Sequence, residues 1–253
     1  CRLFRDALKP PPLYTIFPHP KYPTLNGLMD KLNSVYQKDP TKAPKIVFVL
    51  KGTFRVKRTT HRKKNGKGIV TYEAVIIKYP LKIIGAGQNK TIFHGGGFSI
   101  PRNDHGKNKN KGIVELSRMT VRQTISNKSQ KSGLFANQGL SFVCRDITFT
   151  QCGAHGVCAF KATGRLINCV ITQCTSAGII SGCGGLIELE GSRTKVEKNG
   201  TSEGSYYKGL FALSRSSIHL LSPLTKENVS TNNWKDQNYG GDGTIQTVGV
   251  FER

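Results

Sequence analysis

A short motif that returns along the second half of this chain restricts it to very few folds. GLFA at residues 133–136 returns as GVCA at 156–159, as GIIS at 178–181 and as GLFA at 209–212, at intervals of 23, 22 and 31 residues. A second motif repeats with a similar spacing: FTQC at 149–152 returns as ITQC at 171–174 and as VEKN at 196–199. Such a period is typical of a β-solenoid, whose coils stack on one another. We therefore expect Gly133, Gly156 and Gly178 to mark equivalent corners of parallel coils that stack about 4.8 Å apart.

Two other architectures fit these repeats less well. A leucine-rich repeat of similar period would need Leu-x-x-Leu-x-Leu followed by Asn, which the repeats lack. An antiparallel β-sandwich would need tight hairpins about every 8–12 residues. Few turn sequences of that kind occur after residue 133, so the sandwich is disfavoured.

The N-terminal half begins with a helical pattern. Apolar residues at 25, 28, 29, 32, 35 and 36 fall on one face of an amphipathic helix. Thr24 is placed to cap this helix, and Pro40 follows its end. We predict a helix at 24–37 that covers the first coil, followed by short strands separated by Gly, Asn and Ser.

The residues after this helix form a recognisable unit. They read IVFVLKGTF at 46–54, VIIKYPLKIIGAG at 75–87 and KTI at 90–92. This unit resembles the first coil of the pectate-lyase-like superfamily. The resemblance implies an all-β fold, a right-handed parallel β-helix. We expect about six or seven coils, with the last strand near 244–250. It implies little about function, because the superfamily contains lyases, hydrolases, phage tailspikes and non-catalytic interaction modules.

Positive charge is concentrated in the first half of the chain. Residues 1–133 hold 27 basic and 6 acidic side chains, whereas residues 134–253 hold 11 and 9. Residues 1–23 are proline-rich and basic, and we interpret them as an extended arm outside a single domain at 24–253. Basic insertions interrupt that domain near 55–68 and 102–112, and Asn65-Gly66 predicts a hairpin turn in the first of them.

These insertions supply the predicted binding residues. The first insertion has no acid and the second has only Asp104. Such positive charge attracts an acidic macromolecule, which could be a nucleic acid, an acidic glycan or an acidic protein surface, and added salt should weaken that attraction. Aromatic residues are sparse here, so stacking on single-stranded bases is not expected. The predicted contact residues are Arg55, Lys57, Arg58, Arg62, Lys63, Lys64, Lys67, Arg102, Lys107, Lys109 and Lys111.

Six of the seven cysteines lie between residues 144 and 183, inside the repeats. Cys152 and Cys174 share one register, which predicts small buried side chains in stacked coils. Disulfides are the alternative interpretation. No Cys-x₂-Cys pair occurs, and we expect no zinc site and no cofactor. Core thiols favour a reducing intracellular compartment, or a large assembly such as a virion, over secretion.

Catalysis would need clustered carboxylates. Lyases of the resembled superfamily bind Ca²⁺ through acidic side chains, and its hydrolases use two or three aspartates. Only Glu188 and Glu190 point the same way from one predicted strand, and His219 is expected beside them one coil later. These three residues are the catalytic candidates, and a solvated outer face is the alternative interpretation.

The sequence therefore favours a non-catalytic structural or adaptor subunit. We expect it to dock through its basic half onto an acidic partner, together with other protein subunits of a large assembly such as a virion shell or an organellar or nucleoprotein complex. The alternative is a carbohydrate-active enzyme, either a polysaccharide lyase or a glycoside hydrolase, or a binding module for acidic polysaccharides such as pectate or alginate. No run of about 18 apolar residues occurs, so no membrane span is predicted.

Overall fold

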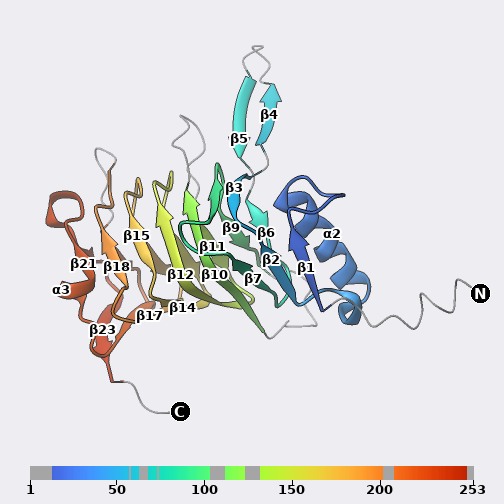
Figure 1. Cartoon of the computed structure of the whole chain (residues 1–253). Helices are drawn as coiled ribbons and strands as arrows, with labels where there is room; N and C mark the ends of the chain where they lie inside the picture. Colours follow the sequence, from blue (N-terminus) through green and yellow to red (C-terminus); the bar gives the residue numbers. More distant parts are fainter. Residues whose placement is uncertain are drawn as a thin grey trace, which may run out of the picture.

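The computed structural model describes residues 13–56, 58–62, 68–72, 74–102, 112–122, 132–201 and 208–249. Apart from one hairpin and one isolated bridge, all pairing between strands in these residues is parallel. Strands from successive coils lie side by side along the molecule (Figure 1). Parallel strands joined by crossover connections take the right-handed path. The chain is thus a right-handed parallel β-helix, as predicted.

The β-helix has three faces. The first and second faces form one continuous 14-stranded sheet, and the third is a separate sheet of seven strands. The first face contains β1 (Tyr14–Phe17), β2 (Ile46–Val49), β7 (Lys82–Gly85), β10 (Ile113–Arg122), β12 (Ser141–Thr150), β14 (Thr163–Ile167), β17 (Leu186–Glu190), β20 (Ser217–Leu221) and β23 (Thr244–Val248). The long strands β10 and β12 bend and continue into the second face, where their last residues pair with other strands.

The remaining strands complete the coils. The second face adds β3 (Gly52–Arg55), β8 (Thr91–His94), β15 (Val170–Thr172), β18 (Lys195–Glu197) and β21 (Ser230–Thr231). The third face contains β6 (Val75–Ile76), β9 (Phe98–Ile100), β11 (Leu134–Asn137), β13 (Val157–Phe160), β16 (Ile179–Gly182), β19 (Leu210–Ala212) and β22 (Tyr239–Gly240). Short helices lie at η1 (Pro40–Lys42), α3 (Lys226–Val229) and η2 (Trp234–Asp236). No helix in the described part of the chain is long and apolar enough to span a membrane.

The observed register confirms both repeats found in the sequence. On the third face it joins Leu134, Val157, Ile179 and Leu210, and on the second face it joins Phe149, Ile171 and Val196. These side chains are buried, so each coil adds one layer to a single apolar core. Parallel strands pair about 4.8 Å apart, which sets the thickness of each layer.

A single residue in the left-handed conformation turns the chain from the first face to the second. The residues at this corner in successive coils are Arg118, Asp146 and Asn168, with φ values of 60°, 53° and 52°. Asp and Asn enter this region more readily than other non-glycine residues. The pairing of β10 with β12 skips the corner residues Arg118 and Asp146 and resumes at Met119 and Ile147, so both strands contribute to two faces.

Helix α2 (Leu25–Lys38) covers the N-terminal end of the core, which confirms the predicted capping helix. The hydroxyl of Thr24 accepts a hydrogen bond from the backbone N–H of Gly27 at 3.2 Å. The helix also binds the open edge of the third face through two amides. Asn26 donates to the carbonyl of Ala74 at 3.0 Å, and Asn33 donates to the carbonyl of Ile76 at 2.9 Å. These bonds satisfy backbone groups that a preceding strand would otherwise pair.

Residues 1–23 were expected to form an extended arm outside the domain. Within this segment the structure instead forms strand β1, which belongs to the first face. This strand pairs with β2, and Phe17 is buried in the core against Phe54, with the two rings 5.1 Å apart. The arm prediction rested on proline content, but the prolines flank β1 rather than interrupt it. Residues 1–12 lie outside the described residues.

The basic insertion after β3 contains a hairpin, as its sequence predicts. Strands β4 (Arg58–Arg62) and β5 (Gly68–Tyr72) pair antiparallel, with Arg62 opposite Gly68. The hairpin projects away from the coils (Figure 1). The predicted Asn65-Gly66 turn and residues 103–111 of the second insertion lie outside the described residues.

Candidate functional site

Three basic side chains stand on adjacent rungs of the second face. Arg55 ends β3, His94 ends β8 and Arg122 ends β10, and the register pairs Arg55 with His94 and His94 with Arg122. The preceding residue of each strand, for example Phe93 or Val121, packs into the core. Alternation along a strand therefore directs the three basic side chains outward. We call Arg55, His94 and Arg122 the basic row.

The basic row concentrates positive charge with little local compensation. The other outward positions of these three rungs are occupied by Thr53, Ile92 and Thr120, so no carboxylate stands among them. The pKa of His94 lies below its usual value, first because the ring is partly buried and then because Arg55 and Arg122 repel a third positive charge. Arg122 donates from Nε to Oε1 of Gln151 at 2.7 Å, which fixes its guanidinium. An anion placed against the row would meet a preformed positive surface.

Hydroxyl groups continue the same face beyond the basic row. Thr148, Thr150 and Thr172 follow on the next two rungs at outward positions. Glu197 is the first acid along this line, three rungs beyond Arg122. The second face thus presents cations at its N-terminal end and hydrogen-bonding hydroxyls in its middle.

The structure describes few of the side chains predicted to bind an anion. Arg55 belongs to the basic row, and Arg102 is exposed after β9. Arg58 and Arg62 lie in β4, where only the backbone is described. The other predicted contacts lie outside the described residues: Lys57, Lys63, Lys64, Lys67, Lys107, Lys109 and Lys111.

Sequence reasoning missed His94 and Arg122. The signal was present, because TFR at 53–55 aligns with IFH at 92–94 and TVR at 120–122, each with a basic residue after an inward apolar one. The intervening insertions hide this alignment in the first half of the chain.

The predicted catalytic candidates do lie together, on the first face. Glu188 pairs in register with His219, and Glu190 is two residues further along β17. The preceding rung contributes Arg165, whose Nε lies 3.7 Å from Oε2 of Glu188 and 2.9 Å from Oε2 of Glu190. The single guanidinium therefore offsets part of the charge of both carboxylates, an arrangement that fits a structural ion-pair cluster.

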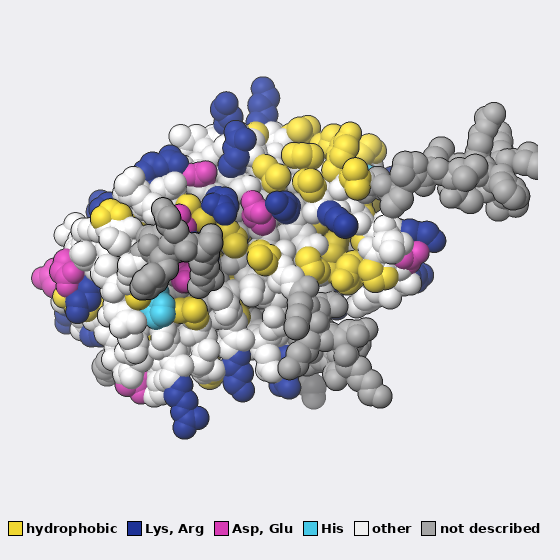
Figure 2. All heavy atoms as spheres, turned by 90° about the horizontal axis from the view of Figure 1, so that it is seen from below, with side chains coloured by type: hydrophobic (Ala, Val, Ile, Leu, Met, Phe, Trp, Pro, Cys, Tyr) yellow, Lys and Arg dark blue, Asp and Glu magenta, His cyan; other side chains and the backbone are white. Residues whose placement is uncertain are grey.

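Charge pairing extends along the first face. Glu115 binds Lys82 at 3.2 Å and approaches Arg145 at 3.9 Å. Figure 2 views the molecule from below, the side along which β14 and β17 lie in Figure 1, and shows basic and acidic side chains interspersed across this surface. Within the described residues, no group of three His, Cys, Asp or Glu side chains is arranged to hold a metal ion.

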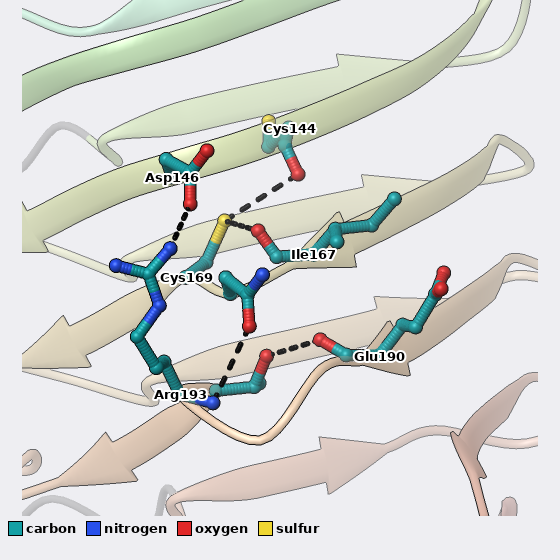
Figure 3. Close-up of polar contacts among 8 residues, drawn as sticks. Cys144, Asp146, Ile167, Cys169, Glu190 and Arg193 are labelled. Carbon is teal, nitrogen blue, oxygen red and sulfur yellow. Dashed lines mark hydrogen bonds and ion pairs between the residues drawn. The ribbon is translucent and has the colours of Figure 1, made fainter. Parts of the chain in front are cut away.

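A further ion pair, between Arg193 and Asp146, joins the corners between the first and second faces. Arg193 binds the carboxylate of Asp146 two coils away, and its backbone N–H donates to Oδ1 of Asn168 in between at 3.3 Å. In Figure 3, Arg193 reaches across one coil toward Asp146, beside the buried thiol of Cys169. Residues 146, 168 and 193 are separated by 22 and then 25 residues, the same spacing as in the repeat at 149, 171 and 196. The contacts of Arg193 tie three coils together and leave Asp146 without a free carboxylate.

Five of the six described cysteines are buried and free, and Cys183 is exposed. The burial of Cys152 and Cys174 confirms their prediction, whereas Cys183 lies at a left-handed corner after β16. Burial raises the pKa of Cys158 and Cys169 to about 12. Cys169 donates a weak hydrogen bond to the carbonyl of Cys144 at 3.5 Å (Figure 3).

Thiol reactivity should separate these two groups. We expect the five buried thiols of the native protein to resist a thiol reagent, because each is shielded from solvent. Cys183 should react rapidly, and Cys183→Ser should remove one fast-reacting group. Full unfolding without reductant should expose close to seven free thiols. A count near one would instead indicate three disulfides.

Comparisons with known proteins add a likeness of fold. No protein-family model matches the chain, and no curated protein matches it either. Seven solved chains match, and three of them show the range of similarity. The Agl-KA catalytic domain has a TM-score of 0.46 at 12% identity, covering 88% of this chain and 45% of that one. The catalytic domain of a GH87 alpha-1,3-glucanase in complex with tetrasaccharides has a TM-score of 0.47 at 15% identity, covering 92% and 40%. The A-module of the Azotobacter vinelandii mannuronan C-5 epimerase AlgE4 has a TM-score of 0.29 at 10% identity, covering 93% and 95%.

The chain spans less than half the length of the first two of these structures. At such identities and TM-scores the similarity carries no information about function. The right-handed parallel β-helix, which the strand pairing establishes, is what this chain has in common with them.

Proposed function

We propose that the chain binds an acidic polysaccharide along its second face, through the basic row. The observation that supports this proposal is the stacking of Arg55, His94 and Arg122 on consecutive rungs with no carboxylate among them. Rungs repeat about every 4.8 Å, so the row offers regularly spaced cations to a polymer that carries regularly spaced carboxylates. Arginine suits this role because its planar fork can hold a carboxylate through two hydrogen bonds.

The remainder of the second face favours a glycan over a nucleic acid. Thr148, Thr150 and Thr172 offer hydroxyls that can exchange hydrogen bonds with sugar hydroxyls. No Phe, Tyr or Trp occupies an outward strand position of this face in the described residues, so bases would find little stacking surface. Docking onto an acidic protein within a larger assembly would use the same row and is the competing proposal.

Binding without catalysis is proposed because the acids on the first face are already paired. Arg165 on the preceding rung lies near both Glu188 and Glu190, whereas a catalytic pair would need one free acid and one free base. A second candidate is a carbohydrate-active enzyme, favoured by the position of His219 beside Glu188. Cleavage of polygalacturonate or alginate that is lost in Glu188→Gln would establish that candidate.

The binding proposal is tested with Arg55→Gln/Arg122→Gln. This double variant removes two exposed charges, so we expect its affinity for polygalacturonate to fall about tenfold at low salt. The slope of log Kd against log salt concentration should decrease by about 1.5, because two fewer counterions are released. Isothermal titration at several salt concentrations measures both quantities, with neutral dextran as the reference polymer.

The matched control is Lys161→Gln/Lys198→Gln, which removes two exposed charges from other parts of the coils. We expect this control to bind polygalacturonate almost as wild type does. Equal losses of affinity in the two double variants would mean that binding depends on net charge and not on the position of the basic row. Tighter binding to DNA than to polygalacturonate at equal salt would contradict the choice of a glycan.

A further inference from the structure

A group of exposed hydrophobic side chains lies at the N-terminal end of the first face. Leu13 is 70% exposed, Tyr14 55%, Ile16 43%, Phe48 38% and Leu50 50%. In the described part of the chain only three other large hydrophobic residues are exposed. Figure 2 shows hydrophobic side chains gathered at this end of the underside. Single exposed apolar residues are ordinary, but a contiguous group indicates an interaction surface. We call these five residues the apolar patch.

The apolar patch follows from the alternation of β1 and β2. Phe17, Val47 and Val49 face the core, so their neighbours face outward. The register places Ile16 beside Phe48, and the rings of Tyr14 and Phe48 lie 5.8 Å apart. A sheet face in contact with water normally carries polar residues at outward positions. These two strands carry large apolar ones instead, which indicates that this face is covered in the functional state.

Strand β1 also leaves an open edge beside the patch. The carbonyls of Leu13 and Phe17 accept hydrogen bonds from Lys45 and Leu50 of the neighbouring segment, at 3.2 Å and 2.9 Å. Alternation therefore directs the backbone groups of Tyr14 and Ile16 away from β2. Within the described residues β1 is the outermost strand of its sheet and no other strand pairs with this edge. An exposed edge beside an apolar face is a template for an added strand.

The charge around the patch identifies the kind of occupant. Lys45 and Lys51 flank β2, both are exposed, and neither has an ion pair within the described residues. A second copy would bring two strongly basic ends together, since residues 1–133 carry 27 basic and 6 acidic side chains. Residues 1–12 include three consecutive prolines, which lack the N–H groups that a strand partner needs. An acidic segment of another protein is the partner that this surface favours.

We propose that an extended acidic segment of another protein adds to the open edge of β1. Its backbone would pair with Tyr14 and Ile16, and its apolar side chains would cover the apolar patch. Its acidic side chains would lie near Lys45 and Lys51. This mode of recognition combines main-chain hydrogen bonds with alternating side-chain contacts. It is independent of the basic row on the second face.

The test uses the full chain and a labelled ten-residue peptide in which valine and glutamate alternate. Fluorescence anisotropy should detect saturable binding of this peptide. Tyr14→Ser/Ile16→Ser should weaken binding at least about tenfold, because it removes the apolar contacts. Both side chains are exposed, so thermal unfolding of this variant should match wild type. Arg55→Gln/Arg122→Gln should bind the peptide as wild type does, which separates this surface from the basic row.

Several results would overturn the proposal. Equal binding of a peptide with lysine in place of glutamate would exclude an acidic partner, and absence of saturable binding would exclude strand addition. A dimer in sedimentation that Tyr14→Ser/Ile16→Ser dissociates would identify a second copy as the occupant. Peptide binding that appears only after deletion of residues 1–12 would show that this segment of the same chain covers the patch.

Discussion

Gly156→Ala should destabilise the β-helix by about 3 kcal/mol, although it adds a single methyl group. A Cβ at this position would lie 2.3 Å from Cγ2 of Ile171 and 2.7 Å from the carbonyl oxygen of Gly178. Both atoms belong to the same or the next layer of the core, so neither can move without disturbing a neighbouring coil. Urea unfolding should therefore show a lower midpoint with little change in the slope.

Gly249→Ala is the matched control for this prediction. A Cβ there meets no atom within 4 Å in the described residues. We expect its free energy of unfolding to stay within about 0.5 kcal/mol of wild type, as for most substitutions outside packed contacts. Similar unfolding midpoints for Gly156→Ala and Gly249→Ala would contradict the stacking of coils around residue 156.

Asn199→Cys should lower the free energy of unfolding by about 3–5 kcal/mol. The Asn199 amide is buried and accepts a hydrogen bond from the backbone N–H of Cys174 at 3.0 Å. It also donates to the carbonyl of Ile171 at 3.0 Å and to Oδ1 of Asn233 at 3.1 Å. The variant would leave several buried polar groups without partners, and each costs about 1–3 kcal/mol.

Cysteine is the informative replacement because the two preceding coils have Cys152 and Cys174 at the equivalent position. Asn228→Ala serves as the control, since that amide caps the exposed helix α3 and its loss should cost only about 1 kcal/mol. If Asn199→Cys unfolded at the same urea concentration as wild type, the position would need only a small side chain. The hydrogen-bonded stack of Asn199 and Asn233 would then contribute nothing measurable.

The sequence predicted the second half of the fold best, because its coils repeat with few insertions. A common register for Phe149, Ile171 and Val196 can be read directly from the spacing, and the structure confirms it. The helix over Leu25–Lys38 was predictable from its apolar periodicity and its threonine cap. Both predictions rest on patterns within a short stretch of sequence.

Other features depend on contacts that no local pattern records. The left-handed corners at Arg118 and Asp146 are not glycines, so turn composition does not reveal them. Strand β1 forms because Phe17 finds a core position beside β2, almost 30 residues further along the chain. The prolines of that segment led to its interpretation as an extended arm, so the four-residue strand β1 was not predicted.

The two candidate sites also differ in how far they could be predicted from the sequence. Glu188 and His219 could be placed side by side because a clean repeat connects their coils. The pairing of Glu188 and Glu190 with Arg165 was missed, since it requires the coil before them to be aligned as well. The basic row combines residues 55, 94 and 122, whose coils are separated by insertions of unequal length. Only the three-dimensional register brings them together.

A crystal structure of the chain with an oligogalacturonate tests the central claim most directly. The account predicts that the oligosaccharide lies along the second face, with carboxylates at Arg55 and Arg122 and with His94 between them. The threonine hydroxyls of the following rungs should contact the next sugars. An oligosaccharide bound instead across Glu188 and His219 on the first face, or no bound sugar at concentrations that saturate binding in solution, would contradict it.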